Sequence, residues 1–123
     1  CWTGSFWTGM LWLAYEITGD DKYRRVAEIQ VQDFKKRLDE NAHLDTHDIG
    51  FLYSLSCVAA YKLTGNEEAK ATALGAADLL IKRFHEKGKF IQAWGSLNDP
   101  NSYRMIIDCM MNLPLLYWAS EVS

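Results

Sequence analysis

The chain has 123 residues, of which 49% are hydrophobic and 24% charged, and its formal net charge is −3. This size and composition are typical of one soluble globular domain. The negative charge excludes the basic surface of a nucleic-acid-binding protein, and no apolar stretch reaches the roughly 20 residues that span a bilayer. The three cysteines, Cys1, Cys57 and Cys109, are widely spaced and odd in number, which argues against disulfides or a zinc site and favours a cytoplasmic protein.

Aromatic residues crowd the start of the chain, before and within a first apolar helix predicted for residues 6–18. The flat face of an aromatic ring can pack against the C–H groups of a sugar, so this cluster indicates a carbohydrate-binding surface. Packing in the core explains the same residues equally well, and the sequence leaves both interpretations open. The cluster consists of Trp2, Phe6, Trp7 and Trp12.

Apolar residues recur at helical spacing along most of the remaining chain. Two predicted helices are apolar on one face, and the others are apolar on most sides, which is typical of helices covered by neighbours. This alternation predicts two layers of helices in an all-α fold. The predicted helices span residues 6–18, about 20–38, 50–64, about 67–84 and 106–122.

The turn after the first helix is repeated later in the chain. Residues 14–19, AYEITG, reappear as residues 60–65, AYKLTG, and a third copy begins in residues 119–123, where the chain ends. In both complete copies the final glycine stands where a left-handed residue closes a helix, and the next residue, Asp20 or Asn66, can cap the following helix. The repeated unit is therefore a helical hairpin, which predicts a solenoid or a closed ring of hairpins.

A glycine-containing insertion, residues 87–102, separates the last two predicted helices. It includes the sequence FIQAWG, which ends in Trp94 and Gly95, and it is predicted to form a short strand or an extended loop. Insertions on one face of a repeat array commonly carry functional residues.

A polar stretch, residues 43–48, comes directly before the helix that begins near Gly50. Asp45 or Thr46 is predicted to cap this helix, which places Asp48 in or beside its first turn. The positive end of the helix dipole favours an ionised carboxylate there. Asp48 is therefore expected to be an anion of the site, although a capping role alone would also explain an acidic residue at this position.

Asp108 lies in a strongly apolar run, and a buried unpaired carboxylate is costly, so we expect it to be either paired or catalytic. Pro114 predicts a kink or a helix that begins near Asn112, and either places Asp108 near a helix N-terminus. Helices of one layer run parallel in an array of hairpins, so Asp48 and Asp108 are expected to face a common mouth. Two carboxylates in different environments are typical of acid–base chemistry on sugars, with Asp108 as the proton donor.

Four segments, in this order, resemble glycoside hydrolase family 88, the unsaturated glucuronyl hydrolases: WTGSFWTGMLWLAYEITGD, THDIGF, AWG and IIDCMMNLPLLYWAS. The resemblance runs over essentially the whole chain, and THDIGF followed by IIDCMMNLPLL is its most specific part. It implies that residues 1–123 are a segment of an (α/α)6 barrel that lacks the first helix and the C-terminal half. Such a segment exposes helix faces that favour self-association, and it is not assumed to be active by itself.

The resemblance also implies an activity. Family members act on unsaturated disaccharides that polysaccharide lyases leave, such as those of the glycosaminoglycan type, and hydrate the C4=C5 vinyl ether of the uronate. By motif, Asp108 is the expected general acid and base, Asp48 is the second catalytic acid, and no metal or organic cofactor is expected. The residues expected to line the sugar pocket are Trp2, Phe6, His47 and Trp94.

Two alternatives are open on the sequence. An HD-type metal-dependent phosphohydrolase would use His47 and Asp48 as metal ligands, with His43 and Asp108 adding to the set. A non-enzymatic helical repeat scaffold would explain the hairpins but gives no reason for Asp108 in an apolar setting. The distance between Asp48 and Asp108 separates these hypotheses, because a scaffold predicts that the acids lie far apart or are locked in local salt bridges.

Overall fold

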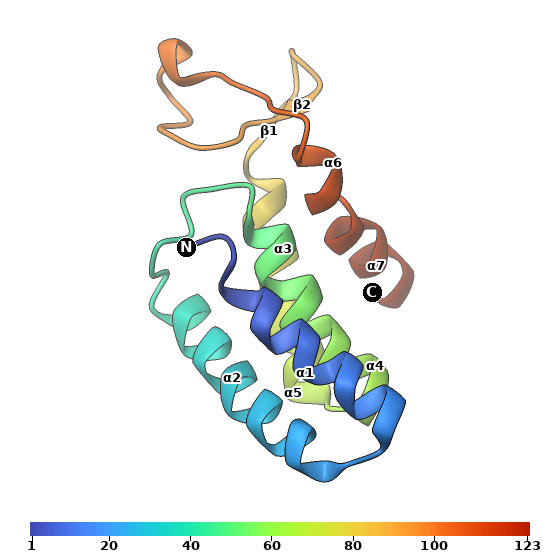
Figure 1. The fold of residues 1–123 in the computed structure, drawn as a ribbon. Coiled ribbons are helices and arrows are strands. Elements are labelled where there is room, and N and C mark those ends of the chain that lie inside the picture. Colours follow the sequence, from blue (N-terminus) through green and yellow to red (C-terminus); the bar gives the residue numbers. More distant parts are fainter.

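Helices make up most of the computed structural model, which describes all residues from 1 to 123 (Figure 1). The α-helices are α1 (Gly4–Thr18), α2 (Asp21–Asp39), α3 (Ile49–Tyr53), α4 (Ala59–Thr64), α5 (Glu67–Ile81), α6 (Cys109–Asn112) and α7 (Pro114–Val122). A π-helical stretch (Ser54–Val58), a 3₁₀ turn (Pro100–Ser102) and two short strands, β1 (Phe84–His85) and β2 (Phe90–Ile91), complete the fold. The predicted all-α class is confirmed.

The two repeated turns have the predicted geometry. Gly19 and Gly65 close α1 and α4 in the left-handed conformation, with φ of 67° and 70°, and each N–H donates to the carbonyl oxygen four residues earlier at 2.8 Å. Asp20 and Asn66 then cap the next helices, because their side chains accept hydrogen bonds from backbone N–H groups in the first turns of α2 and α5. The unit of the fold is therefore a helical hairpin, as the sequence predicts.

Alternate helices of the hairpins point in the same direction (Figure 1). Helices α1, α3 and α6 start toward the end of the molecule that carries the β-hairpin, and α2 and α5 return toward that end. α3, the π-helical stretch and α4 follow one another without a break as one helix from Ile49 to Thr64, which contacts α1, α2 and α5. The N-termini of α3 and α6 therefore lie on the same side of the molecule.

The helix predicted for residues 67–84 is shorter than expected, because α5 ends at Ile81. The chain then turns into an antiparallel hairpin in which Phe84 pairs with Ile91. Phe84 fits the helical spacing of its neighbours, but it lies on a strand and packs beside the core. The insertion predicted to form a strand or an extended loop begins within this hairpin.

The helix predicted for residues 106–122 starts only at Cys109 and is interrupted at Leu113. Pro114 has no N–H group and cannot continue the hydrogen-bond ladder of α6, so it opens α7 at the first helical position instead. A helix thus begins already at Cys109 rather than near Asn112, and the interruption beside Pro114 corresponds to the kink, the other outcome that the sequence allows.

The core lies where α2 and α5 pack against the long central helix. Tyr53 is fully buried there, and its hydroxyl donates to the carbonyl oxygen of Phe34 at 3.0 Å, so the polar end of the ring is satisfied. Small residues line the buried face of α5: Ala69, Ala73, Ala76 and Ala77. None of the helices combines the length and hydropathy needed to cross a lipid bilayer.

The three cysteines are free thiols, of which Cys1 is exposed and the other two are buried. Burial raises the pKa of Cys57 to about 12. Burial also raises the pKa of Cys109, and the charge of the adjacent Asp108 adds to this effect. Because the thiolate is the reactive form, both buried thiols are expected to be inert at neutral pH.

We expect Cys57 to escape alkylation by iodoacetamide at neutral pH in the folded protein and to react fully in guanidinium chloride. Mass spectrometry of the labelled peptides measures both states, and the exposed Cys1 serves as the internal control that reacts in each. Rapid labelling of native Cys57 would contradict its burial in the central helix.

Replacing Gly65 with alanine is expected to lower the free energy of unfolding by about 1 kcal/mol, because a φ of 70° is unfavourable for an L side chain. A Cβ atom there would meet nothing within 4 Å, so the cost is conformational rather than steric. Gly4→Ala is the matched control, since Gly4 has equally open surroundings but lies in α1, where alanine is neutral or stabilising. Urea denaturation measures the free energy of unfolding of both variants. Equal values would contradict the left-handed conformation of Gly65.

Candidate active site

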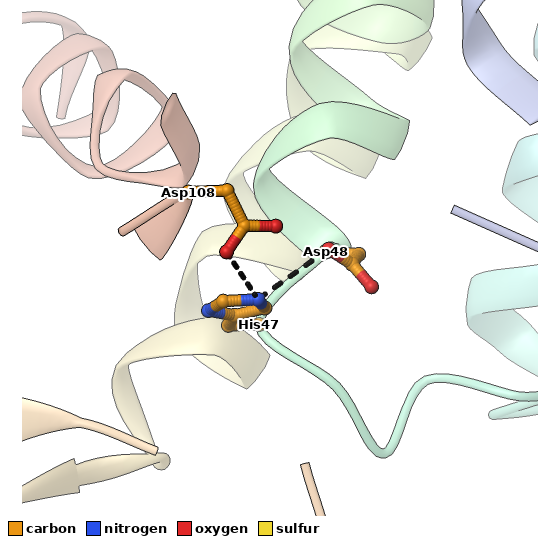
Figure 2. Close-up of side chains that lie close together, drawn as sticks. All are labelled: His47, Asp48 and Asp108. Carbon is orange, nitrogen blue, oxygen red and sulfur yellow. Dashed lines mark ion pairs between the residues drawn. The ribbon is translucent and has the colours of Figure 1, made fainter. Parts of the chain in front are cut away.

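Three side chains meet at the N-termini of α3 and α6 (Figure 2). His47 Nε2 lies 3.5 Å from Oδ1 of Asp48 and 3.5 Å from Oδ1 of Asp108. One nitrogen of the histidine and one oxygen of each acid all lie within 4.8 Å of one another. The two carboxylates predicted to face a common mouth are therefore brought together, with the imidazole between them.

Asp48 stands at the N-cap position of α3, and its side chain makes no capping hydrogen bond. The prediction that Asp45 or Thr46 caps this helix is wrong, because the helix starts at Ile49. Thr46 instead holds the carboxylate: its hydroxyl donates to Asp48 Oδ2 at 2.8 Å, while the backbone N–H of Asp48 donates to Thr46 Oγ1 at 3.2 Å. The Asp48 side chain is thereby held close to His47, and only 17% of it is exposed.

His47 is almost completely buried, with 1% of its side chain exposed. Its backbone N–H donates to the carbonyl oxygen of Ala93 at 2.7 Å, and the neighbouring Thr46 pairs with Trp94 in an isolated antiparallel bridge. The insertion predicted to carry function therefore lies directly against the loop that supplies His47 and Asp48. Its backbone fixes where the imidazole enters the site.

The surroundings of Asp108 differ from the prediction. The apolar residues next to it in sequence point away from the core, since Met105, Ile106, Ile107 and Met110 are all exposed. The Asp108 side chain is 37% exposed and therefore more open than that of Asp48. The expectation of a carboxylate in apolar surroundings is wrong, because residues 103–108 form an irregular segment whose apolar side chains lie on the surface. One oxygen, Oδ1, is nevertheless buried and accepts no hydrogen bond.

Two buried polar residues, missed by the sequence analysis, support the loop beside the site. The Arg83 guanidinium contacts the Asp45 carboxylate and donates to the carbonyl oxygens of Gln92 at 2.9 Å and Gly95 at 3.3 Å. Gln92 is fully buried, and its Nε2 donates to the carbonyl oxygens of residues 94–96. Together they hold the loop that presents Trp94. The only sequence signal was a polar residue inside the apolar run FIQAW.

The aromatic residues divide into two groups. Trp12 is 2% exposed and belongs to the core, whereas Trp2 and Phe6 are 50% and 40% exposed. Trp2 and Phe6 pack with Phe51 in a cluster whose ring centroids lie 5.7 to 5.8 Å apart. Phe51 follows Asp48 by three residues, a spacing that places both on one face of the helix. Phe51 was missed, because its position in an apolar helix is typical of a core residue.

Trp94 lies in the insertion, beside the loop that carries Asp48. It is 42% exposed, and the Arg104 guanidinium lies 5.2 Å from its ring centroid. The bridge to Thr46 ties its backbone to the loop that carries the catalytic candidates. Exposed aromatic surfaces therefore come from two different elements, α1 and the insertion, as expected for the walls of a binding site.

The geometry also bears on the two alternative hypotheses. Asp48 and Asp108 are neither far apart nor paired with lysine or arginine, so the condition that would favour a pure scaffold is not met. His47, Asp48 and Asp108 offer one nitrogen and two carboxylate oxygens, which could together bind a divalent ion. His43, the additional ligand that the HD hypothesis requires, is exposed and lies outside this set.

Comparison with known proteins gives a consistent match over nearly the whole chain. Residues 2–123 match the model of Glycosyl Hydrolase Family 88. The chain is 51% identical over 120 residues to an unsaturated chondroitin disaccharide hydrolase of Streptococcus pneumoniae, and 53% identical over 121 residues to an unsaturated glucuronyl hydrolase of Bacillus sp. strain GL1. Each alignment covers 98% of this chain but only 30% and 32% of these relatives, so the chain spans about a third of their length.

Solved structures of unsaturated glucuronyl hydrolases also match nearly the whole chain. The unsaturated glucuronyl hydrolase of Bacillus sp. GL1 superposes with a TM-score of 0.95 at 52% identity, and that of Streptococcus agalactiae with 0.96 at 48% identity. These matches cover 98% of this chain and 32% and 30% of those chains. Both structures are (α/α)6 barrels, and the predicted fold, a segment of such a barrel, is confirmed. The chain belongs to glycosyl hydrolase family 88.

Proposed function

We propose that the protein containing this chain hydrolyses unsaturated uronyl disaccharides by hydrating the C4=C5 double bond of the uronate. The observation that carries the proposal is the convergence of Asp48 and Asp108 on His47. The names of the relatives support the substrate class, since they are unsaturated chondroitin disaccharide and unsaturated glucuronyl hydrolases. A related Streptococcus agalactiae structure, 37% identical with a TM-score of 0.79, is complexed with dGlcA-GalNAc6S, which supports a glycosaminoglycan-type disaccharide.

In the proposed mechanism, Asp108 is the general acid and base. It transfers a proton to C4, the π electrons of the double bond form the new C4–H bond, and positive charge develops at C5 and the ring oxygen. Water adds at C5 and returns a proton to the Asp108 carboxylate. The resulting hemiketal collapses and releases the second sugar together with a keto-aldehyde uronic product. The open side of Asp108 suits this role, because it can reach a bound sugar.

Asp48 has the supporting role in this proposal. Thr46 fixes one of its oxygens, and the carboxylate is less exposed than that of Asp108, so it is held in one orientation. A fixed anion near C5 stabilises the positive charge that develops there. His47 lies between the two acids and orients both, while Trp2, Phe6 and Trp94 offer flat surfaces for the sugar rings.

We further propose that residues 1–123 form part of a longer (α/α)6 domain that supplies the first helix and the C-terminal half. The share of the relatives that the chain covers supports this proposal. Residues that complete the pocket then lie in the remainder of the domain. Tests of activity therefore require the full-length protein.

Asp108→Asn in the full-length protein is expected to lower kcat by at least about a hundredfold, because the amide cannot deliver the proton. Asp48→Asn is expected to impair the reaction as well, through loss of the anion. The assay supplies an unsaturated chondroitin disaccharide and follows the loss of ultraviolet absorbance from the double bond. Asp78→Asn is the matched control, since Asp78 is an exposed acid of α5 without a salt bridge.

The assignment fails if the wild-type protein leaves the double bond intact, or if Asp108→Asn and Asp78→Asn react equally fast. Elemental analysis of the wild-type protein tests the metal-dependent alternative. A stoichiometric divalent ion that is lost in Asp48→Asn would favour a phosphohydrolase site instead.

We also propose that segment 1–123 in isolation associates with further copies of itself. Two apolar grooves support this proposal. The larger, of about 620 Å³, lies between the β-hairpin, residues 105–107 and α6–α7, and 12 of its 13 lining residues are hydrophobic. The smaller, of about 390 Å³, lies between α1 and the central helix and includes Met10, Leu13 and Leu55.

The isolated segment is expected to elute as dimers or larger species in size-exclusion chromatography with light scattering. Ile107→Lys and Met110→Lys place charges in the larger groove at exposed positions and are expected to shift the segment toward monomer. Ile29→Lys is the control, because Ile29 is an equally exposed apolar residue of α2 outside both grooves. A wild-type segment that stays monomeric at high concentration would rule out the association.

A further inference from the structure

Both acids stand where a helix begins, yet neither caps its helix. Asp48 is the N-cap residue of α3 and Asp108 that of α6, and neither side chain makes a capping hydrogen bond. An aspartate in this position normally accepts a hydrogen bond from the second or third N–H group of the helix. Asp20 does so at the start of α2, where it accepts from Lys22 N at 2.9 Å. The N–H group of Phe51, in the first turn of α3, therefore needs a different acceptor.

Asn112 supplies that acceptor from another helix. Its Oδ1 accepts a hydrogen bond from the backbone N–H of Phe51 at 2.7 Å. Phe51 is the third residue of α3, which is the position that the N-cap side chain usually serves. Asn112 is 1% exposed, so no solvent competes for this bond.

The nitrogen of the Asn112 side-chain amide binds the backbone of Asp108. Asn112 Nδ2 donates to the carbonyl oxygen of Asp108 at 3.1 Å. A single side chain thus connects the first turn of α3 with the backbone of Asp108. α6 has only four residues, too few to hold its own N-terminus rigidly, so this link contributes to where Asp108 lies.

The contact depends on the absence of a side chain at Gly50. A Cβ atom on Gly50 would lie 2.3 Å from the Asn112 Cα atom and 2.4 Å from its carbonyl oxygen. The obstacle is backbone rather than the end of a flexible side chain, so any larger residue would force α3 and α6 apart. Gly50 therefore permits the approach, and the Asn112 amide holds it.

We propose that Asn112 is a positioning residue for the acid pair: it caps α3 in place of Asp48 and fixes the backbone of Asp108. Both carboxylates are thereby left free to face His47 and the substrate. The catalytic part of this inference rests on the proposed function. The capping part does not, because it concerns hydrogen bonds of the protein alone.

In Asn112→Ala, the Phe51 N–H group loses its acceptor, and Asp48, the N-cap residue of the same helix, has a carboxylate that can replace it. Asp48 is expected to turn and cap its own helix, as Asp20 does, and to leave His47. In the full-length protein, kcat is expected to fall about tenfold to a hundredfold, as for a misplaced catalytic group, while KM changes less than about threefold. Thr72→Ala is the matched control, since it removes the side-chain hydrogen bond of another buried residue, to Glu68 O, in α5.

A purely structural role predicts that both variants, when folded by circular dichroism, keep nearly the wild-type kcat, and this result would overturn the inference. Amide hydrogen exchange gives a second readout that needs no activity. The amide hydrogen of Phe51 is expected to exchange faster than in the wild type in Asn112→Ala and at the wild-type rate in Thr72→Ala. If the wild-type protein has no activity on the disaccharide, the proposed function fails, and unchanged exchange of Phe51 would still overturn the capping role.

If Asn112→Ala does not fold, Asn112→Asp takes its place. This variant has the same size and keeps an acceptor for Phe51, but it lacks the donor to the Asp108 carbonyl. It is expected to keep the slow exchange of Phe51 and to lose at least about tenfold in kcat. A wild-type kcat in Asn112→Asp would overturn the part of the inference that concerns Asp108.

Discussion

The close approach of Gly50 to Asn112 is the contact on which the site depends. It sets α3 and α6 side by side at their N-termini, and no residue other than glycine leaves room for it. The hairpin repeat makes these helices parallel, but parallel helices with ordinary side chains have axes 8 to 10 Å apart. The backbone contact and the Asn112 amide bring the starts of the two helices closer. His47 can therefore reach both carboxylates from one buried position.

Much of this arrangement could be predicted from the sequence. The repeated AYxxTG turns specify hairpins, hairpins make alternate helices parallel, and parallel helices place Asp48 and Asp108 at one end. The exposure of Asp108 could not be predicted, because its apolar neighbours were assigned to a helix that begins only at Cys109. The role of Asn112 was equally hidden, since its partner Phe51 is 61 residues away and a hydrogen bond to backbone leaves no pattern in the sequence.

The insertion shows how a polar interior can be built without loss of stability. Arg83 and Gln92 are both buried, and each donates to carbonyl oxygens of the loop that follows β2, while Arg83 also binds the Asp45 carboxylate. Buried polar groups are costly only when they lack partners. The hydrogen bonds of these two buried side chains thus hold a loop with few apolar residues in one conformation. This shape presents Trp94 beside Thr46.

The π-helical stretch at Ser54–Val58 has a consequence for the two ends of the central helix. Each residue of an α-helix advances the chain by about 100° around the axis, so one wider turn rotates everything after it relative to everything before it. The face that α3 turns toward α6 is therefore out of phase with the face that α4 turns toward α7, where Tyr61 meets Trp118. One continuous helix can then pack against two neighbours that lie in different directions, with the acid pair at one end and the aromatic contact at the other.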